Sequence, residues 1–341
     1  FSPERLWKHA FNPDGSPVPG PINSLGLYHF DSFGNLNLLY RDPDISSMCP
    51  LPIRPRPRPA SVSSDVPWQA GVQEGTVLLA DVYRGDLQAF DKGTIRNLRI
   101  VGVPPKLDPR MNYPSLGVTQ DDPGKFVLGT VPVEADGSAF FRVPAGLPFF
   151  VQALDDQGRA MQTMRSVTYV QPGERYTCIG CHEPRHTAPP NVFPMAAARA
   201  PSKIIPGPEG SWPLDFQELV QPVMERHCVS CHKPGGEDPD FDLTAANSYE
   251  SLVSYGSPSL REHVLARYNE GRSIAGACAA RSNSLWQLLD TGHYHVELSS
   301  DDRRRLATWM DTYGQRLGSF DREQEERLRK LRRRMTAMLA D

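Results

Sequence analysis

The sequence lacks any run of the roughly 18 consecutive apolar residues that a membrane-spanning helix requires, and its most apolar stretch is the short segment 143–154. It also lacks a strong charge of either sign, because 37 Lys and Arg oppose 40 Asp and Glu for a net charge of −3. A chain this close to neutral has no general attraction for nucleic acid or for an anionic membrane surface. We therefore expect no membrane span and no nucleic-acid partner.

Several common catalytic signatures are missing as well. No Ser-His-Asp set, phosphate-binding loop or paired-carboxylate motif stands out, so the sequence leaves open whether the protein is an enzyme. The chain begins at Phe1 and not at a methionine, and we expect a signal peptide or a further N-terminal domain to precede this numbering. Its 341 residues suffice for two or three domains that each bury a core.

Two complete CxxCH motifs occupy residues 178–182 and 228–232. Six cysteines and nine histidines in this length would give about 0.003 such matches by chance. Two thiols three residues apart reach the two vinyl groups of one haem, and the adjacent histidine places an imidazole under the iron. We therefore predict two covalently attached haem c groups. The thiols are those of Cys178, Cys181, Cys228 and Cys231, and the motif histidines are His182 and His232.

The motifs also indicate a compartment. Bacterial haem attachment of this kind takes place outside the cytoplasmic membrane, which predicts a periplasmic or extracellular protein. The alternatives are a zinc ribbon built from both CxxC units, or two redox CxxC pairs. Neither needs a histidine after each second cysteine, and a periplasmic chain seldom keeps four free thiolates.

The first half of the chain is poor in helical patterns. An Arg-Pro alternation at 53–59 favours an extended polyproline II strap. Between about residue 70 and residue 176, six β-rich runs separated by turn residues are typical of an antiparallel β-barrel or sandwich. The runs are 77–83, 95–103, 126–133, 139–143, 149–154 and 161–170.

Helical patterns begin after a linker that carries seven prolines between residues 187 and 213. Asp215 can cap a helix over 216–224 that leads into the second CxxCH, as in small cytochrome c domains. Asp321 and Gln324 resemble a capping box at the start of the last helix. The predicted fold class is α+β and multidomain, with an antiparallel β-barrel or sandwich middle domain before an α-helical cytochrome c-like domain. The predicted regions are 1–60, a middle domain at 61–190 with the first haem, a Pro-rich linker at 191–213, and a helical domain at 214–341 with the second haem.

The stretch PGERYTCIGCHEPR at 172–185 resembles the hydrazine synthase alpha subunit and the broad group of related bacterial di-haem cytochromes. The resemblance extends to segment 155–168, the Arg-Pro strap, the second CxxCH and the Gly292-His293-Tyr294 turn. It is at the level of the family and not of hydrazine synthase itself. It implies that residues 1–60 are the exit strands of a β-propeller that precedes a middle β-barrel with the first haem.

The resemblance also implies different roles for the two haems. In the family, the first haem is reactive, a tyrosine four residues after the motif histidine binds its iron, and that histidine binds zinc with a distant cysteine. Here the fourth residue after His182 is His186, and imidazole in place of phenolate should raise the haem potential and weaken the case for synthase chemistry. Cys49 is the candidate zinc thiolate. The alternatives are an ordinary buried Cys49 and a His182 that binds iron directly.

The second haem takes its proximal ligand, His232, from the motif. The sixth ligand must come from downstream histidines or methionines, and His293, 61 residues on in a Gly-flanked turn, is the first choice. The resemblance favours it over His295, and His263 and Met310 are substitutes. An iron bound by two histidines is closed to substrate, so this haem is predicted to transfer electrons.

Three functional hypotheses follow. The first is a periplasmic or extracellular di-haem c-type cytochrome that transfers electrons between redox protein partners. The second is a haem-dependent oxidoreductase that acts on a small nitrogen or oxygen species at the first haem, with Arg165 or Arg185 aiding an anionic ligand or pairing with haem propionates. The third is a structural subunit that wires haems through a larger complex or oligomer.

Overall fold

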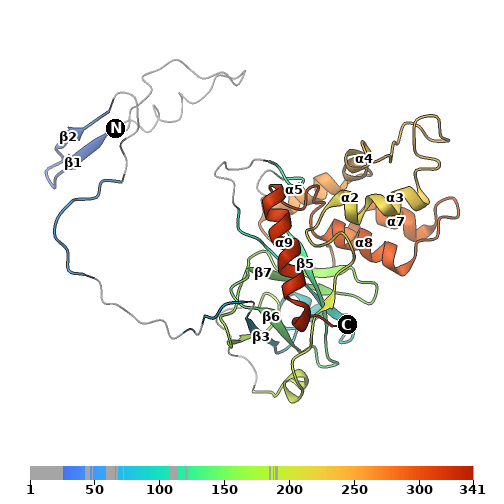
Figure 1. Cartoon of the computed structure of the whole chain (residues 1–341), viewed down its shortest axis with the longest axis horizontal. Helices are drawn as coiled ribbons and strands as arrows, with labels where there is room; N and C mark the ends of the chain where they lie inside the picture. Colours follow the sequence, from blue (N-terminus) through green and yellow to red (C-terminus); the bar gives the residue numbers. More distant parts are fainter. Residues whose placement is uncertain are drawn as a thin grey trace. The chain divides into compact units, whose positions relative to one another are not determined.

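A computed structural model describes residues 26–42, 47, 49–58, 66, 68–71, 73–106, 114–119, 122–183, 186, 188 and 191–340. Arg185 and Pro59, the end of the predicted strap, lie outside these residues. The chain divides into two compact units, Phe1–Ser63 and Ser64–Asp341 (Figure 1). The predicted division of the second unit into middle domain, linker and helical domain stays a prediction.

The first unit contains one antiparallel hairpin, formed by β1 (Leu27–Phe30) and β2 (Leu36–Tyr40). Asp31 closes its turn by accepting hydrogen bonds from the backbone amides of Phe33 and Asn35 at 2.9 and 3.0 Å. Residues 51–58 follow as exposed chain that is neither helix nor strand. Large apolar side chains of the hairpin are exposed, among them Phe30, Leu36, Leu38, Leu39 and Tyr40.

The second unit begins with two sheets. The five-stranded sheet has the order β10-β5-β4-β7-β8 and is antiparallel throughout, whereas the three-stranded sheet has the order β6-β3-β9. The strands are β3 (Glu74–Leu79), β4 (Asn97–Gly102), β5 (Phe126–Pro132), β6 (Ala139–Pro144), β7 (Phe149–Leu154), β8 (Ala160–Thr163), β9 (Arg175–Cys178) and β10 (Ile205–Pro206). Each of the six predicted β-rich runs overlaps a strand, so these runs are confirmed.

The predicted β fold differs from the structure in two respects: of the alternatives barrel and sandwich, the closed barrel is wrong, and so is the strictly antiparallel pairing. The described strands form open sheets and no closed barrel, and β9 pairs with β3 in parallel. β9 follows β3 only after a long excursion of the chain, and a parallel neighbour can be reached by such a crossover. The edge strand β10 ends in Pro206, which has no N–H group to offer a further strand. Both sheets contribute side chains to one apolar core.

Burial along two strands explains their positions. β3 alternates half-buried and buried residues, as expected for a strand with one face on the core. β4 is buried at five consecutive positions, Leu98 to Gly102, because it lies at the centre of the five-stranded sheet and is covered on both faces. A near-continuous apolar run thus marks the central strand.

Helices fill the C-terminal part, which confirms the predicted α+β class. They are α2 (Phe216–Leu219), α3 (Gln221–His227), α4 (Ser248–Ser254), α5 (Leu260–Glu270), α6 (Ala279–Ser282), α7 (Ser284–Thr291), α8 (Ser300–Asp311) and α9 (Arg322–Arg334), with 3₁₀ turns η1 (Asp86–Ala89), η2 (Met195–Ala198) and η3 (Thr336–Met338). Asp215 caps α2 by accepting from the amides of Gln217 and Glu218, as predicted. Phe216, Trp309 and other apolar side chains form a second core among these helices.

A buried polar cluster joins the five-stranded sheet to α8. Arg99 of β4 is 2% exposed, and its Nη1 lies 3.8 Å from Oδ2 of Asp311, the last residue of α8. Gln152 of β7 accepts from Arg99 Nη1 at 2.8 Å and donates to the Asp311 carbonyl at 2.7 Å. Burial raises the pKa of Asp311 to about 6. The buried ion pair of Arg99 and Asp311 therefore links the five-stranded sheet to α8, and each charge stabilises the other.

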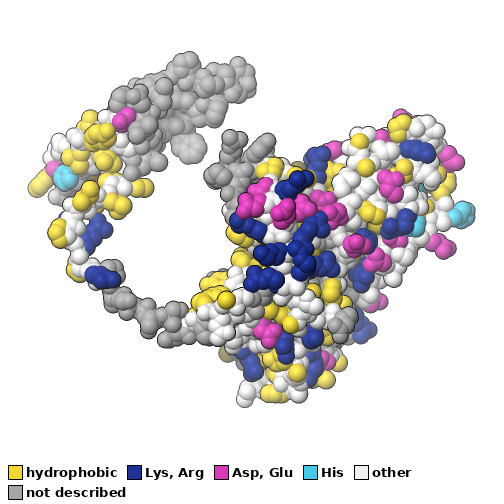
Figure 2. Space-filling model, in the orientation of Figure 1, with side chains coloured by type: hydrophobic (Ala, Val, Ile, Leu, Met, Phe, Trp, Pro, Cys, Tyr) yellow, Lys and Arg dark blue, Asp and Glu magenta, His cyan; other side chains and the backbone are white. Residues whose placement is uncertain are grey.

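The last helix packs on the strands. Leu328, Met335 and Met338 belong to the same apolar core as β3 to β7, and Trp212 Nε1 donates to the Leu328 carbonyl at 3.0 Å. Asp321 accepts from the Gln324 amide, so the predicted N-terminus of this helix is confirmed. Charged side chains cover its outer surface in Figure 2. In the described part of the chain, no helix combines the length and the apolar character needed to cross a membrane.

Candidate haem-binding sites

The second CxxCH forms a helical turn at the end of α3. The amide of Cys228 donates to the Met224 carbonyl at 2.8 Å, and the amides of Cys231 and His232 donate to the Cys228 carbonyl at 3.1 and 3.0 Å. A helical turn brings residues three and four apart to the same face. Both thiols and the motif histidine are thus held together by local backbone bonds.

An apolar cavity of about 280 Å³ lies beside this turn. Half of its lining residues are leucines, and only a few are polar. The lining residues are Met224, Cys228, His232, Asp238, Phe241, Leu243, Leu252, Tyr255, Leu285, Leu288, Leu289, His293, Leu298 and Leu306. A pocket of apolar side chains with few polar groups is the usual surrounding of a cofactor.

Two imidazoles meet in this cavity. The ring centres of His232 and His293 are 5.9 Å apart, and the ring planes differ by 16°. Two imidazoles that each lie about 2 Å from a shared metal have ring centres about 6 Å apart. The spacing of these two side chains fits a metal held between them, so His232 and His293 are the residues that would bind the iron of a haem at the second motif.

The turn that carries His293 explains why His293, and not His295, lies in the cavity. Gly292, Tyr294 and His295 have φ angles of 93°, 45° and 62°, so the chain bends sharply around His293. His293 is half-buried and lines the cavity, whereas His295 is exposed. The two alternative sixth ligands also lie outside the cavity lining. Met310 is in the helical core, and His263 contacts Ser282 Oγ at 3.4 Å.

Asp302 of α8 holds the helix that precedes the second motif. Its carboxylate accepts from the guanidinium of Arg226, lies 3.1 Å from His227 Nε2, and accepts from Ser299 Oγ at 2.7 Å. Burial alone would raise the pKa of Asp302, but the hydrogen bonds from Ser299, Arg226 and His227 lower it to about 2. The end of α3 is therefore tied to the start of α8 by an ionised carboxylate.

The first CxxCH has a different backbone. Cys178 ends β9 and pairs with Leu79 of β3. The Cys178 carbonyl accepts from the Ala80 amide at 2.8 Å, and the Cys181 amide donates to the Arg84 carbonyl at 2.9 Å. A Cβ on Gly180 would lie 2.2 Å from the Arg84 carbonyl oxygen, which is far inside contact distance. This motif is thus an extended segment pressed against residues 80–86.

The thiols of the first motif are partly buried and neutral. Cys178 and Cys181 pack against the core of the strands. Burial raises the pKa of Cys178 to about 11 and that of Cys181 to about 12, and the nearby Glu183 carboxylate adds to both shifts. Burial likewise raises the pKa of Cys228 to about 11. Neutral thiols packed against two different cores do not form a preassembled four-thiolate zinc site.

His182 and several other predicted residues of the first site are more exposed to solvent than the residues of the second site. His182 has a φ angle of 65° and a side chain that is 65% exposed. His186 is exposed. Cys49 belongs to the first unit and is also exposed, so the expectation of an ordinary buried cysteine is wrong. Arg165 lies over the Tyr313 ring at 5.1 Å.

Among the residues described, no group of three or more His, Cys, Asp and Glu side chains could hold a metal ion. The structure therefore brings together His232 and His293, and it does not show a second imidazole facing His182 in the described chain.

Sequence reasoning missed two carboxylates beside the motif histidines. Asp86 Oδ2 lies 2.7 Å from His182 Nδ1. Asp238 Oδ2 lies 3.3 Å from His232 Nδ1, at ion-pair distance but without the alignment of a hydrogen bond. Asp86 precedes its histidine by 96 residues, and no local pattern could have identified it. Asp238 lies six residues after His232, and the two glycines before it are the sequence signal for a loop that returns toward the motif.

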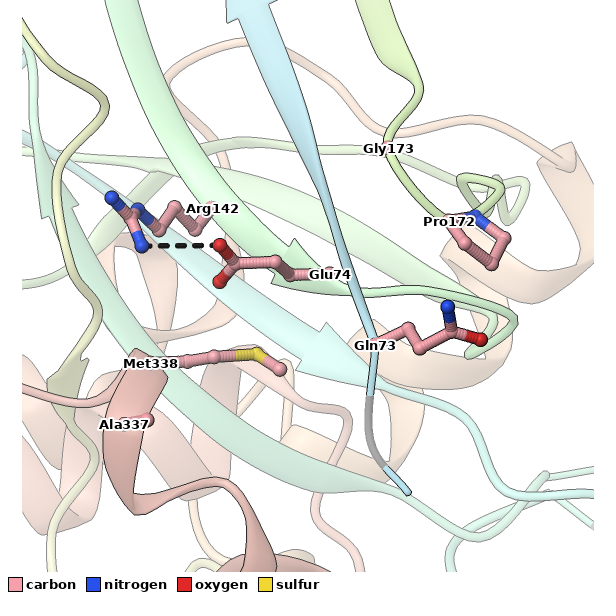
Figure 3. A pocket seen from close by; sticks show the side chains of 7 residues that line it. All are labelled: Gln73, Glu74, Arg142, Pro172, Gly173, Ala337 and Met338. Atoms are coloured by element: carbon pink, nitrogen blue, oxygen red, sulfur yellow. Dashed lines mark hydrogen bonds and ion pairs between the residues drawn. The ribbon is translucent and has the colours of Figure 1, made fainter. Parts of the chain in front are cut away.

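A separate cavity of about 430 Å³ lies at the edge of the three-stranded sheet and contains none of the predicted site residues (Figure 3). Arg142 and Glu74 form an ion pair of 3.1 Å beside it, and side chains of η3 border it. The lining residues are Gln73, Glu74, Arg142, Pro172, Gly173, Ala337 and Met338. It shares no lining residue with the cavity at the second motif.

Comparisons with known proteins agree on one family. Residues 93–183, which include the whole first motif, match the hydrazine synthase alpha subunit middle domain. Hydrazine synthase subunit alpha of Kuenenia stuttgartiensis is 36% identical over 56 residues, which are 16% of this chain and 7% of that protein. The structure of Kuenenia stuttgartiensis hydrazine synthase superposes with a TM-score of 0.52 at 15% identity, covering 72% of this chain and 43% of that chain. The chain thus spans less than half the length of the relatives it matches. It is related to the hydrazine synthase alpha subunit through a middle domain at residues 93–183.

Proposed function

We propose that this protein is a periplasmic or extracellular di-haem c-type cytochrome of a bacterium that transfers electrons between redox protein partners. The observation that carries the proposal is the pair of imidazoles, His232 and His293, facing each other at 5.9 Å in an apolar cavity beside Cys228. The relation to a hydrazine synthase subunit supports a redox-related role.

The residues of the second motif have distinct tasks in this proposal. A haem bound there supplies a one-electron couple at its iron. Cys228 and Cys231 would hold it by thioether bonds, and His232 and His293 would both bind its iron and so keep substrates from the metal. Seven leucines line the cavity, so a haem there would lie in largely apolar surroundings, which influence its reduction potential.

The first motif has a different task. Cys178 and Cys181 would hold the first haem, with His182 as an axial ligand and His186 as a candidate for the opposite side. His182 is 65% exposed, and the match to the hydrazine synthase alpha subunit middle domain includes this motif. These two observations favour a second candidate function, a haem-dependent oxidoreductase that acts on a small nitrogen or oxygen species at the first haem.

Membership of a larger complex is part of the proposal. The relative in Kuenenia stuttgartiensis is named as a subunit. In this chain the hairpin of β1 and β2 exposes large apolar side chains, which are often covered by another domain or protein. A structural role in wiring haems through such a complex is compatible with the same observations.

Intact mass spectrometry of the chain produced with bacterial haem attachment tests the proposal. We expect two haem additions on the wild-type chain, and one on the double variant Cys228→Ala/Cys231→Ala. Carbon monoxide added to the reduced protein should leave the second haem unchanged. Binding at the first haem favours the oxidoreductase, whereas a polypeptide of bare mass overturns both candidate functions.

A further inference from the structure

The two CxxCH motifs have different backbones, but each is met by an aspartate in the same way. The amide of Asp86 donates to the carbonyl of Cys181 at 3.2 Å, and the amide of Asp238 donates to the carbonyl of Cys231 at 3.1 Å. In both cases the accepting residue is the second cysteine of the motif. The carboxylate of the same aspartate then faces Nδ1 of the motif histidine, at 2.7 Å for Asp86 and 3.3 Å for Asp238.

Different parts of the chain build these two contacts. Asp86 begins η1, and the neighbouring Gly85 forms a bridge with Cys181, where a Cβ would lie 2.1 Å from the Cys181 carbonyl oxygen. Asp238 ends a short loop after the motif, in which a Cβ on Gly236 would lie 2.2 Å from the Cys231 carbonyl oxygen. In each case a glycine permits the close approach that places the aspartate.

The position of the carboxylate decides which ring nitrogen is free. A carboxylate at Nδ1 favours the tautomer that carries its proton there, so Nε2 keeps its lone pair. His232 needs this partner, because its buried Nδ1 has no hydrogen bond in the described chain and lies only 3.3 Å from Asp238. Histidines that bind metals usually donate their other ring N–H to such a partner, which orients the ring and increases its basicity.

Resting on the proposed function, we propose that Asp86 and Asp238 are positioning residues that direct Nε2 of His182 and His232 to the two haem irons. A more basic imidazole stabilises ferric over ferrous iron, so each carboxylate lowers the reduction potential of its own haem.

The test is a redox titration, followed by visible spectra, of the full chain with both haems attached. Asp238→Asn should raise the midpoint potential of the second haem alone, and Asp86→Asn that of the first haem alone. By comparison with other partners of metal-bound histidines we expect a change of about tenfold in the reduction equilibrium, or about 59 mV for one electron. The double variants Cys178→Ala/Cys181→Ala and Cys228→Ala/Cys231→Ala assign each potential.

Matched controls separate this effect from general charge removal. Asp240→Asn and Asp91→Asn remove exposed carboxylates close in sequence to Asp238 and Asp86, and both potentials should stay unchanged. Asp238→Glu should keep most of the wild-type potential. The electron paramagnetic resonance spectrum of the oxidised protein gives a second readout, since the g values of low-spin haem depend on the basicity of the imidazole.

The outcomes are distinct. Two attached haems whose potentials do not move in Asp238→Asn and Asp86→Asn overturn the inference and leave the cytochrome proposal intact. A shift at the second haem only confines the inference to Asp238 and overturns the assignment of His182 to iron. A wild-type chain without haem overturns the proposed function itself.

Discussion

The same five-residue motif occurs twice in this chain and adopts two backbones. At residues 228–232 it is a helical turn beside an apolar cavity in which His293 faces the motif histidine. At residues 178–182 it is the end of a parallel edge strand, and the side chain of His182 is 65% exposed. The neighbours of a CxxCH motif, and not the motif, thus decide whether its histidine is enclosed or accessible.

The largest effect is expected from His293→Ala, which removes one of the two imidazoles at the second site. His293→Ala leaves the imidazole of His232 without its partner in the cavity, and the second haem should change from inert to carbon monoxide-binding, as proposed for an open iron. Difference spectra of the reduced protein with and without carbon monoxide measure this change. His295→Ala is the control, because His295 is exposed and outside the cavity. A second haem that stays inert in His293→Ala contradicts the assignment of this ligand.

The next effect concerns the connection between the two regions. Asp311→Asn leaves the guanidinium of Arg99 buried without its counter-charge, and loss of one partner of a buried pair costs about 3 kcal/mol or more of unfolding free energy. Denaturant unfolding monitored by circular dichroism measures it. Asp290→Asn breaks contacts to Arg303 and Arg159 on a carboxylate that is 39% exposed, and it should cost less than about 1 kcal/mol. Equal costs for the two variants contradict a structural role of the buried pair.

Exchanging the third residue between the motifs tests their different backbones. Gly180→Ser places a Cβ 2.2 Å from the Arg84 carbonyl oxygen and should destabilise the protein by about 1–3 kcal/mol. The reverse change, Ser230→Gly, affects an exposed residue of the second motif and should cost at most about 1 kcal/mol. Thermal unfolding with a haem count for each variant checks both values. A harmless Gly180→Ser would show that the first motif is not pressed against residues 80–86.

A smaller effect depends on pH. The folded-state pKa of Asp302 is lowered to about 2, below the ordinary value for an unfolded chain. Its contribution to stability is therefore complete above about pH 4 and is lost as the pH falls toward 2, by roughly 1–2 kcal/mol. Unfolding free energies measured across this range should decrease less steeply in Asp302→Asn. If the pH dependence of the unfolding free energy is the same in Asp302→Asn, the Asp302 carboxylate does not stabilise the link between α3 and α8.

Local patterns accounted for much of the fold. Asp215 and Asp321 cap helices as predicted, because a side chain that accepts hydrogen bonds from amides two or three residues ahead acts within one turn. The β-rich runs also became strands, because their β-branched and aromatic residues and the turn residues between them are local signals. The parallel pairing of β3 with β9 was not predictable, since antiparallel and parallel partners place the same alternation of side chains on a strand.

The residues of the candidate sites likewise fall into those that local sequence identified and those that it did not. Cys228, Cys231 and His232 carry their chemistry in adjacent positions, and the choice of His293 followed from its turn and from a family resemblance. Asp86 could not be identified, because 96 residues separate it from His182 and only the pairing of β3 with β9 brings them together. Asp238 is close in sequence, but its role depends on how the loop turns back.

By itself, the sequence determined the two CxxCH motifs, the strand and helix types, and the helix caps, because these depend on residues a few positions apart. Only the tertiary structure decided which side chains face each motif histidine, that the sheets stay open, and that α9 packs on the strands. Such contacts arise when distant segments bury their apolar faces against each other, and burial selects partners by shape and not by their distance along the chain.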